Sequence, residues 1–237
     1  MSFPVVILAG GLGTRLGEIT KTVPKALVEV NGEPFLAHQL RLLRSNGIER
    51  VVMCVSHLGE MIREYAGDGS MFGLRLDYSF DGAILLGTAG AVRRALPLLD
   101  ESFFVLYGDS YLPCDFGWVG KSFEQSGKLG LMTVYQNEGQ WDASNVEFAD
   151  GRILAYDKSV RSPRMRFIDY GLGVFRRTVF RELPAEESFD LARLYQKLLA
   201  RGELAACEIS QRFYEIGSVS GLNELSEYLA SREKRSL

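Results

Sequence analysis

Short apolar runs of strand-forming residues recur along the first half of the chain. They cover residues 5–9, 51–55 and 103–107 and are rich in Val, Ile and Phe. Their length and their lack of polar alternation are typical of strands that are buried on both faces. Parallel strands covered by helices on both sides have this pattern, so we expect the three runs to lie in one parallel sheet.

Helical periodicity fills the spaces between these runs. One predicted helix begins near Pro34 and ends at Gly47. Its apolar face consists of Phe35, Leu36, Leu40 and Leu43. A second helical segment covers residues 88–96, just before the third apolar run. This alternation predicts an α/β fold, Rossmann-like and doubly wound, around a mostly parallel mixed sheet.

The second half of the chain has a different pattern. Residues 145–156 predict two short strands joined at the Asp150-Gly151 turn, and residues 166–175 predict a longer strand. A helix with leucines on one face ends at Gly202, and a last helix covers residues 220–231. We expect this half to form a mixed lobe packed against the parallel sheet.

Neither a linker nor an internal repeat divides the sequence. We therefore predict a single domain over residues 1–237, with residues 1–115 and 116–237 as its two halves. A chain of this length can bury about 70% of the surface that it exposes when unfolded. It needs neither a disulfide nor a structural metal to hold its core.

Charge composition limits the possible partners. The chain has 27 Lys and Arg against 30 Asp and Glu, a formal net charge of −3. Binding along a nucleic acid needs a surplus of cationic side chains on one face, so a nucleic-acid partner is not expected. A hydrophobic content of 46% is typical of a folded globular protein rather than a disordered chain.

The cysteines and the termini indicate a cytoplasmic protein. Cys54, Cys114 and Cys207 are far apart and have no Cys or His neighbours at metal-ligand spacing, so we expect three buried thiols in a reducing compartment. The apolar N-terminus lacks the basic segment of a signal peptide. No apolar stretch reaches the roughly 20 residues that span a bilayer, so no membrane partner is expected.

A glycine-rich loop follows the first apolar run. Its glycines include Gly10, Gly11 and Gly13, at the point where the strand should end. Open sheets bind ligands at the carboxyl ends of their strands, and glycines there let backbone N–H groups approach phosphate oxygens. The loop therefore indicates phosphate binding. A tight turn that serves only strand-to-helix packing is the structural alternative.

Two common phosphate-binding motifs do not fit this loop. The dinucleotide fingerprint requires a third glycine where the chain has Leu16, and Pro24 interrupts the helix that should follow. This disfavours an NAD-dependent dehydrogenase. The P-loop requires a lysine after its last glycine, but Gly17 is followed by Glu18.

Two cations flank the glycines. Arg15 lies inside the loop and Lys25 follows Pro24. An arginine can hold polyphosphate oxygens with two hydrogen bonds, while a lysine supplies a compact positive charge. Together they suit a triphosphate whose charge increases during transfer. Either residue alone would more often be a solvated surface group.

Five motifs in order give the chain a family resemblance. They are Gly-Gly-Leu-Gly-Thr-Arg-Leu at 10–16 with Pro-Lys-Ala-Leu at 24–27, Asn-Gly-Glu-Pro-Phe-Leu at 31–36, Leu-Gly-Thr-Ala-Gly-Ala at 86–91, Tyr-Gly-Asp-Ser at 107–110 and Tyr-Glu-Ile-Gly-Ser at 214–218. This combination closely resembles the sugar-1-phosphate nucleotidylyltransferases. In its compactness the chain is similar to the group that includes heptose-1-phosphate guanylyltransferases and muramate-type uridylyltransferases.

The resemblance implies a nucleotide site and a Mg²⁺ site. The residues that it assigns to the nucleotide are Leu8, Ala9, Gly10, Gly11, Gly13, Thr14, Gly87 and Thr88. Asp109 and Glu215 match the family's two metal-binding carboxylates, which are usually both Asp. A turn-capping role for Asp109 and an exposed strand-end charge at Glu215 are the structural alternatives.

The resemblance also implies a sugar-phosphate site. Lys158 matches the lysine that holds the phosphate of the sugar 1-phosphate, and Asp157 stands where the family has a Glu that contacts sugar hydroxyls. Asn145, Asp169 and Gly171 occupy stretches that face the sugar in relatives. The chain departs from the family around residues 144–146, where a Tyr-Gly pair is usual, and Ser159 replaces a proline. A hairpin-edge ion pair is the structural alternative for Lys158.

The implied reaction joins an NTP and a sugar 1-phosphate. The sugar-phosphate oxygen attacks the α-phosphorus and pyrophosphate leaves, with Mg²⁺ as cofactor and with Arg15 and Lys25 as the catalytic cations. A monomer or a small homo-oligomer is expected. A sugar-nucleotide-binding regulatory domain with weak or no catalysis is the alternative function. The motifs do not decide which nucleobase or sugar is used.

Overall fold

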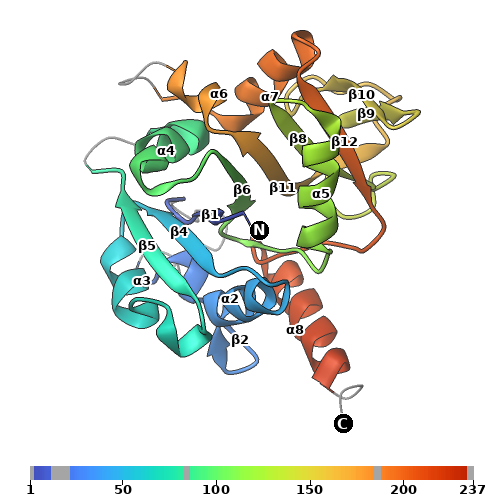
Figure 1. Ribbon diagram of the computed structural model, residues 1–237. Helices are drawn as coiled ribbons and strands as arrows, with labels where there is room; N and C mark the ends of the chain where they lie inside the picture. Colours follow the sequence, from blue (N-terminus) through green and yellow to red (C-terminus); the bar gives the residue numbers. More distant parts are fainter. Residues whose placement is uncertain (1–2, 12–21, 83–85, 184–187, 234–237) are drawn as a thin grey trace.

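A nine-stranded sheet forms the centre of the molecule. The computed structural model describes residues 3–11, 22–82, 86–183 and 188–233. In this sheet the strands follow the order β10-β9-β11-β6-β1-β4-β5, with β8 on β11 and β12 on β8 (Figure 1). The strands are β1 (Val5–Leu8), β4 (Arg50–Val55), β5 (Arg75–Phe80), β6 (Ser102–Tyr107), β8 (Gly130–Gln136), β9 (Val146–Ala149), β10 (Arg152–Tyr156), β11 (Phe167–Arg176) and β12 (Leu204–Ile209).

The three apolar runs of the sequence form the parallel centre of this sheet. β1 lies between β4 and β6, with Val5 opposite Val51 on one side and Phe104 on the other. All three of these side chains are buried. The expected strands are therefore confirmed. Their carboxyl ends lie at one edge, where the loops that follow β1, β4, β5 and β6 come together.

Helices cover both faces of the sheet. They are α2 (Phe35–Ser45), α3 (Gly59–Ala66), α4 (Gly87–Ala95), α5 (Phe116–Ser126), α6 (Thr178–Arg181), α7 (Leu191–Ala200) and α8 (Val219–Glu233), with 3-10 turns η2 (Lys25–Leu27), η3 (Ser70–Phe72) and η4 (Leu96–Leu98). Val5 and Ile7 pack in the core with α2, α3 and α5, while Val6 packs in a second core with α4, α6 and α7. Figure 1 shows α4 and α2 on opposite sides of the parallel strands. The doubly wound α/β expectation is confirmed.

The second half of the chain continues the same sheet. We expected a mixed lobe packed against the parallel strands, but β11 pairs antiparallel with β6 on one side and with β8 on the other. Leu172 lies opposite Leu106 in this ladder. The β9–β10 hairpin turns at Asp150 and Gly151 with φ of 51° and 72°, as the sequence predicted.

Two short ladders lie outside the main sheet. β2 (Glu29–Val30) pairs with β3 (Glu33–Pro34), and β7 (Ser110–Tyr111) pairs with β13 (Tyr214–Glu215). Helix α8 packs beneath both through a small core that includes Val30, Tyr111 and Ile216. This core joins the C-terminal helix to the first half of the chain.

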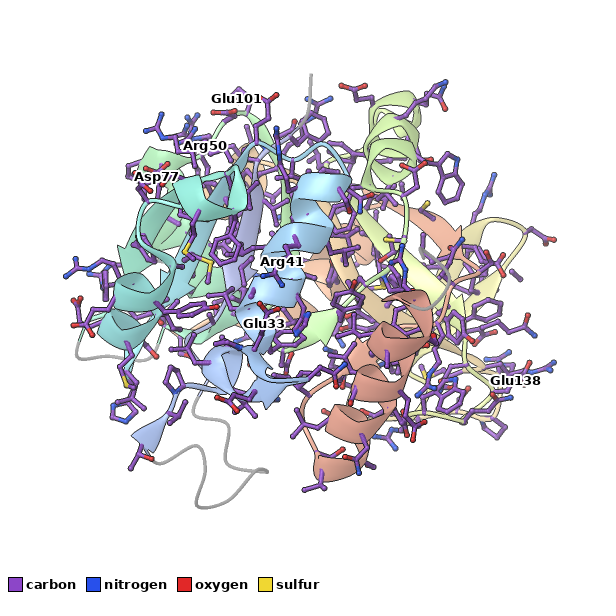
Figure 2. All side chains as sticks on the ribbon, turned by 90° about the horizontal axis from the view of Figure 1, so that it is seen from below. Glu33, Arg41, Arg50, Asp77, Glu101 and Glu138 are labelled. Carbon is purple, nitrogen blue, oxygen red and sulfur yellow. The ribbon has the colours of Figure 1, made fainter. Side chains whose placement is uncertain are left out.

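The ion pairs at the amino edge of the sheet are structural. Arg50, the first residue of β4, donates to Asp77 of β5 at 3.0 Å and to Asp100 at 3.3 Å. Figure 2 shows Arg50 and Asp77 beside one another. Both lie at the end of the sheet away from the strand-end loops.

The expected burial of the three cysteine thiols is also confirmed. Cys54, Cys114 and Cys207 are buried and carry free thiols. Burial raises the pKa of Cys114 to about 12 and that of Cys207 to about 11. Among the described residues, no helix combines the length and the apolar composition that crossing a bilayer requires.

Candidate active site

The glycine loop begins between the ends of two neighbouring strands. Ala9 N donates to Cys54 O of β4 at 2.8 Å, and Gly108 N donates to Leu8 O at 3.0 Å. A side chain at position 108 would place Cβ 2.7 Å from Leu8 O, so only glycine permits this approach. Leu8 and Ala9 therefore lie at the parallel strand ends, next to Gly108 and Asp109.

Residues that follow β4 and β5 lie next to Gly10. Ser56 Oγ, after β4, donates to Gly10 O at 2.5 Å. A Cβ at position 10 would lie 3.1 Å from that hydroxyl and 3.5 Å from Asp81 Oδ2, after β5. Gly11 is exposed and has open space around it. Three other expected site residues, Gly13, Thr14 and Arg15, lie outside the described part of the chain.

Lys25 and Asp109 form an ion pair across the site. Lys25 follows Pro24 at the start of η2, and its Nζ lies 2.5 Å from Asp109 Oδ2. Their side chains are 14% and 27% exposed, so the pair is partly shielded but open to a ligand. The second carboxylate oxygen, Oδ1, accepts from Ser110 Oγ at 3.4 Å. The structure thus joins an amine and a carboxylate that are 84 residues apart.

Glu215 lies on the segment that pairs with the Asp109 turn. In the β7–β13 ladder Glu215 is opposite Ser110, and Ile216 N donates to Asp109 O at 3.0 Å. Gln39 of α2, which is buried, fixes the other side of the turn by donating to Ser110 O at 2.8 Å and to Tyr107 O at 3.2 Å. The two carboxylate residues therefore occupy adjacent, hydrogen-bonded segments.

The donor set of these two segments fits Mg²⁺. Magnesium is commonly held by one or two carboxylates, with phosphate oxygens and water completing its shell. Asp109 and Glu215 offer two carboxylates of this kind. Among the residues that the structure describes, no group of three or more His, Cys, Asp or Glu side chains could hold a metal alone. Water or the oxygens of a bound phosphate would complete the shell of a metal held by these two carboxylates.

Gly87 and Thr88 lie at the start of α4 and contact α7. Gly87 has φ +72°, and a Cβ there would be 2.8 Å from Phe189 O. Ala89 N donates to the same carbonyl at 2.8 Å, and Thr88 Oγ1 accepts from Leu191 N at 2.7 Å. The Thr88 hydroxyl thus caps the first turn of α7. These contacts couple the loop after β5 to the second half of the chain.

A second cluster of charged groups surrounds Asp169. The Asp169 side chain is 2% exposed, and its Oδ2 lies 3.6 Å from Lys158 Nζ and accepts from Tyr156 Oη at 3.2 Å. The Lys158 amine also lies 5.2 Å from the centre of the Tyr107 ring. Burial lowers the pKa of Lys158, but Asp169 and Tyr107 outweigh burial and raise the pKa above its ordinary value. Lys158 is therefore a permanent cation with a half-exposed side chain.

Backbone contacts hold this cluster in shape. Asn145 Oδ1 accepts from Asp169 N at 2.9 Å, and Asp169 Oδ1 accepts from Gly171 N at 3.1 Å. Gly171 has φ +99°, and a Cβ there would be 3.6 Å from Ser110 Oγ. Because Ser110 follows Asp109 directly, the Asp169 cluster adjoins the Lys25–Asp109 pair.

Asp157 is engaged in a turn. Its Oδ1 accepts from Ser159 N at 2.7 Å and from Val160 N at 2.8 Å, and Gln196 Nε2 lies 3.3 Å from its Oδ2. The hydrogen bonds from Val160 N and Ser159 N lower the pKa of Asp157. The structure therefore shows Asp157 organising the backbone around Lys158.

The sequence analysis missed Asp81. This residue is 7% exposed, it follows β5 directly, and its Oδ1 has no hydrogen-bond partner. Burial raises the pKa of Asp81, although Arg94 opposes the shift. A carboxylate directly after a strand of a parallel sheet lies at the ligand-binding edge, but β5 itself was not predicted, so Asp81 could not be placed there from the sequence.

Comparisons with known proteins identify the family of the chain. Residues 4–232 match the model of the nucleotidyl transferase family. The chain is 30% identical to a UTP–glucose-1-phosphate uridylyltransferase of Synechocystis, over 96% of this chain and 63% of that protein. It thus spans less than two thirds of that relative's length.

Two other relatives have a length similar to that of this chain. It is 29% identical to the D-glycero-alpha-D-manno-heptose 1-phosphate guanylyltransferase of Campylobacter jejuni, over 90% of this chain and 93% of that protein. It is 30% identical to the N-acetylmuramate alpha-1-phosphate uridylyltransferase of Neisseria meningitidis, over 92% of this chain and 95% of that protein.

Solved structures show the same fold. HddC from Yersinia pseudotuberculosis superposes with a TM-score of 0.80 at 22% identity, covering 96% of this chain and 99% of that chain. The inositol-1-phosphate CTP transferase of T. maritima superposes with a TM-score of 0.76 at 23% identity, covering 97% and 95%. The resemblance found in the five sequence motifs is confirmed: the chain belongs to the nucleotidyl transferase family.

Proposed function

We propose that the protein transfers a nucleoside monophosphate from an NTP to a sugar 1-phosphate, giving an NDP-sugar and pyrophosphate, with Mg²⁺. The observation that carries this proposal is the meeting of two sites at one edge of the sheet. The Lys25–Asp109 pair and the Lys158–Asp169 cluster adjoin through Gly171 and Ser110. Relatives named as uridylyl- and guanylyltransferases of sugar 1-phosphates support the same reaction.

The proposed reaction depends on positive charge near the phosphates rather than on a general base. An oxygen of the sugar 1-phosphate forms a bond to the α-phosphorus, and the bond from that phosphorus to the bridging oxygen of the β-phosphate breaks. Pyrophosphate leaves with the electron pair. Because the attacking oxygen is already anionic, no side chain has to remove a proton. Catalysis then rests on positioning and on neutralising charge.

The cationic residues of the site would have different roles in this reaction. Lys25 would neutralise the phosphates around the reacting phosphorus, and Arg15 would stabilise the departing pyrophosphate. Lys158 stays protonated at neutral pH and would hold the phosphate of the sugar 1-phosphate. Asp169 keeps the Lys158 amine in place through their 3.6 Å contact.

Asp109 and Glu215 would hold Mg²⁺. When bound, the ion supplies further positive charge for the phosphate oxygens. Asp109 already contacts Lys25, so its two oxygens could serve an amine and a metal together. Glu215 has a longer side chain than the usual Asp, and the β7–β13 ladder holds its backbone beside the Asp109 turn.

A substrate matrix tests the proposal. Purified protein and Mg²⁺ are mixed with each of UTP, GTP, CTP, dTTP and ATP against glucose, mannose, heptose and N-acetylmuramate 1-phosphates, and pyrophosphate release is measured. We expect release with at least one pair, and its loss when EDTA removes the metal. Binding of an NDP-sugar without any release would instead identify a non-catalytic binding domain.

A further inference from the structure

The Lys158 amine lies between two polar partners. Its Nζ is 3.6 Å from Asp169 Oδ2, and it donates a hydrogen bond to the hydroxyl of Tyr107. It is also 5.2 Å from the centre of the Tyr107 ring. The reaction proposed above gives Lys158 a phosphate to hold, but it assigns no role to Tyr107.

The contact with Asp169 is longer than a direct hydrogen bond between these groups. An ammonium and a carboxylate that share a charge-assisted hydrogen bond are about 2.7–2.9 Å apart. The Asp169 side chain is 2% exposed, whereas that of Lys158 is 44% exposed. Because a close cation stabilises a buried carboxylate, Asp169 attracts the amine inward, away from solvent and from any ligand. An opposing contact is therefore needed to keep the amine accessible.

The Asp169 carboxylate is fixed by other hydrogen bonds. Tyr156 Oη donates to its Oδ2 at 3.2 Å, and Gly171 N donates to its Oδ1 at 3.1 Å. The backbone N of Asp169 donates to Asn145 Oδ1 at 2.9 Å. Lys158, by contrast, carries its amine on a flexible four-carbon stem. Closure of the gap would therefore move the amine rather than the carboxylate.

Tyr107 is held on both its backbone and its ring. It is the last residue of β6, opposite Leu8 of β1, and its carbonyl accepts from Gln39 Nε2 at 3.2 Å. A Cβ at Gly171 would lie 3.6 Å from Tyr107 Cδ2, so the ring packs against that glycine. The Tyr107 hydroxyl is thus a fixed acceptor, two residues before Asp109.

We propose that Tyr107 is a positioning residue, which holds the Lys158 amine away from Asp169 and accessible to the phosphate of a sugar 1-phosphate. This inference rests on the proposed function, because it takes that phosphate as the ligand of Lys158. Without the Tyr107 hydroxyl, the amine would close onto Asp169, and this ion pair would have to open before the phosphate could bind. Asp169 would then compete with the phosphate for the amine.

Removal of the hydroxyl alone tests the proposal. Tyr107→Phe keeps the ring and its packing against Gly171, so we expect the fold to persist in circular dichroism. Calorimetric titration, with a non-hydrolysable NTP analogue present, measures the dissociation constant of the sugar 1-phosphate that supports the fastest pyrophosphate release. We expect this constant, and KM for the sugar 1-phosphate, to rise about tenfold. KM for the NTP should stay within about twofold.

A matched control removes a hydroxyl elsewhere on the sheet. Tyr78 of β5 donates to Gly67 O at 2.7 Å through its hydroxyl. Tyr78→Phe therefore loses one hydrogen bond of a tyrosine, as Tyr107→Phe does, but at a residue that contacts neither Lys158 nor Asp169. It should leave the dissociation constant and both KM values unchanged.

A second background separates positioning from a general structural effect. Asp169→Asn keeps the shape of the side chain but removes the charge that attracts the amine. We expect Tyr107→Phe to weaken binding less than about threefold in the Asp169→Asn background, because the amine is no longer drawn inward. A hydroxyl that served only packing would cost the same in both backgrounds.

Three results would overturn the proposal. One is a dissociation constant in Tyr107→Phe that stays within about twofold of the value for the unaltered protein. Another is an equal rise in KM for both substrates. The third is an equal loss of binding in both backgrounds, since Asp169 would then play no part.

The two proposals fail in distinguishable ways. If the unaltered protein releases no pyrophosphate with any substrate pair, the proposed function fails. If it releases pyrophosphate but Tyr107→Phe binds and uses the sugar 1-phosphate as the unaltered protein does, only the role of Tyr107 fails.

Discussion

The contact between α8 and Glu215 gives a quantitative prediction. Gly221 is the third residue of α8, and a Cβ there would lie 2.0 Å from Glu215 O. The two atoms must separate by about 1.4 Å to reach the 3.4 Å of ordinary contact. The obstacle is backbone, so Gly221→Ala cannot be relieved by a rotamer change. Either the start of α8 or the Glu215 segment has to move.

Movement of this size should affect activity more than stability. Ala is worth about 1 kcal/mol over Gly inside a helix, while overpacking costs about 1–3 kcal/mol. The net loss of about 1 kcal/mol should lower Tm by about 3 °C in a domain of this size. A misplacement of about 1 Å at reacting groups can cost about a hundredfold in rate. We therefore expect kcat/KM for pyrophosphate release to fall about a hundredfold.

Thermal unfolding and pyrophosphate release measure the two effects. Gly117→Ala in α5 is the control, because its Cβ would meet only Asp115 Oδ1, at 3.2 Å, and the position is exposed. It should leave kcat/KM unchanged. If Gly221→Ala stayed within threefold of the unaltered protein, the position of Glu215 would not matter for the reaction, and this reasoning would be refuted.

Three further substitutions test the groups around the site. Asp109→Ala should lower kcat at least about a hundredfold, with the fold retained in circular dichroism, because the metal and Lys25 both lose a partner. Lys158→Ala should raise KM for the sugar 1-phosphate by about tenfold or more and leave KM for the NTP within about twofold. Asp81→Asn should raise Tm more at pH 7.5 than at pH 4.5. Burial raises the pKa of Asp81, so its stabilising protonated form is lost as pH rises through the folded-state pKa.

Each of these predictions has a contradicting result. Near-normal turnover in Asp109→Ala would remove Asp109 from the metal role. Equal effects of Lys158→Ala on both substrates would place Lys158 elsewhere in the site, and Lys121→Ala, at an exposed position of α5, controls for loss of a positive charge. A Tm difference for Asp81→Asn that does not change with pH would contradict the raised pKa of Asp81.

The sequence predicted the buried strands and the long amphipathic helices well. The strands β1, β4 and β6 are continuous apolar runs that are buried in the structure. Their spacing along the chain indicates an α/β fold. The strand β5 was missed because its sequence Arg-Leu-Asp-Tyr-Ser-Phe alternates polar and apolar residues, whereas the strands were predicted from continuous apolar runs. The short helix α3 was missed because it begins after Leu58, which has φ +59°, without a capping side chain.

The contacts between residues of the site could not be predicted from the sequence alone. The family resemblance predicted that Lys25 and Asp109 lie in one cleft. Their direct contact of 2.5 Å could not be predicted, because it depends on the path of the turn after β6. The Thr88 hydroxyl bond to Leu191 N joins residues 103 apart and leaves no local pattern. The stacking of Arg212 on Trp141 is likewise a contact between two loops, for which a single sequence gives no periodic signal.

The antiparallel pairing of β11 with β6 limits how the chain could vary in length. Leu172 is held opposite Leu106, and this register sets how far Asp169 lies from Asp109. A residue inserted between Asp169 and Leu172 would turn later side chains to the other face or shift Asp169 along the sheet. In the connection between β10 and β11, residues 161–165 lie beyond Lys158 and the turn held by Asp157, and they belong to no strand. We therefore expect insertions and deletions to be tolerated at residues 161–165 and to abolish activity within β11.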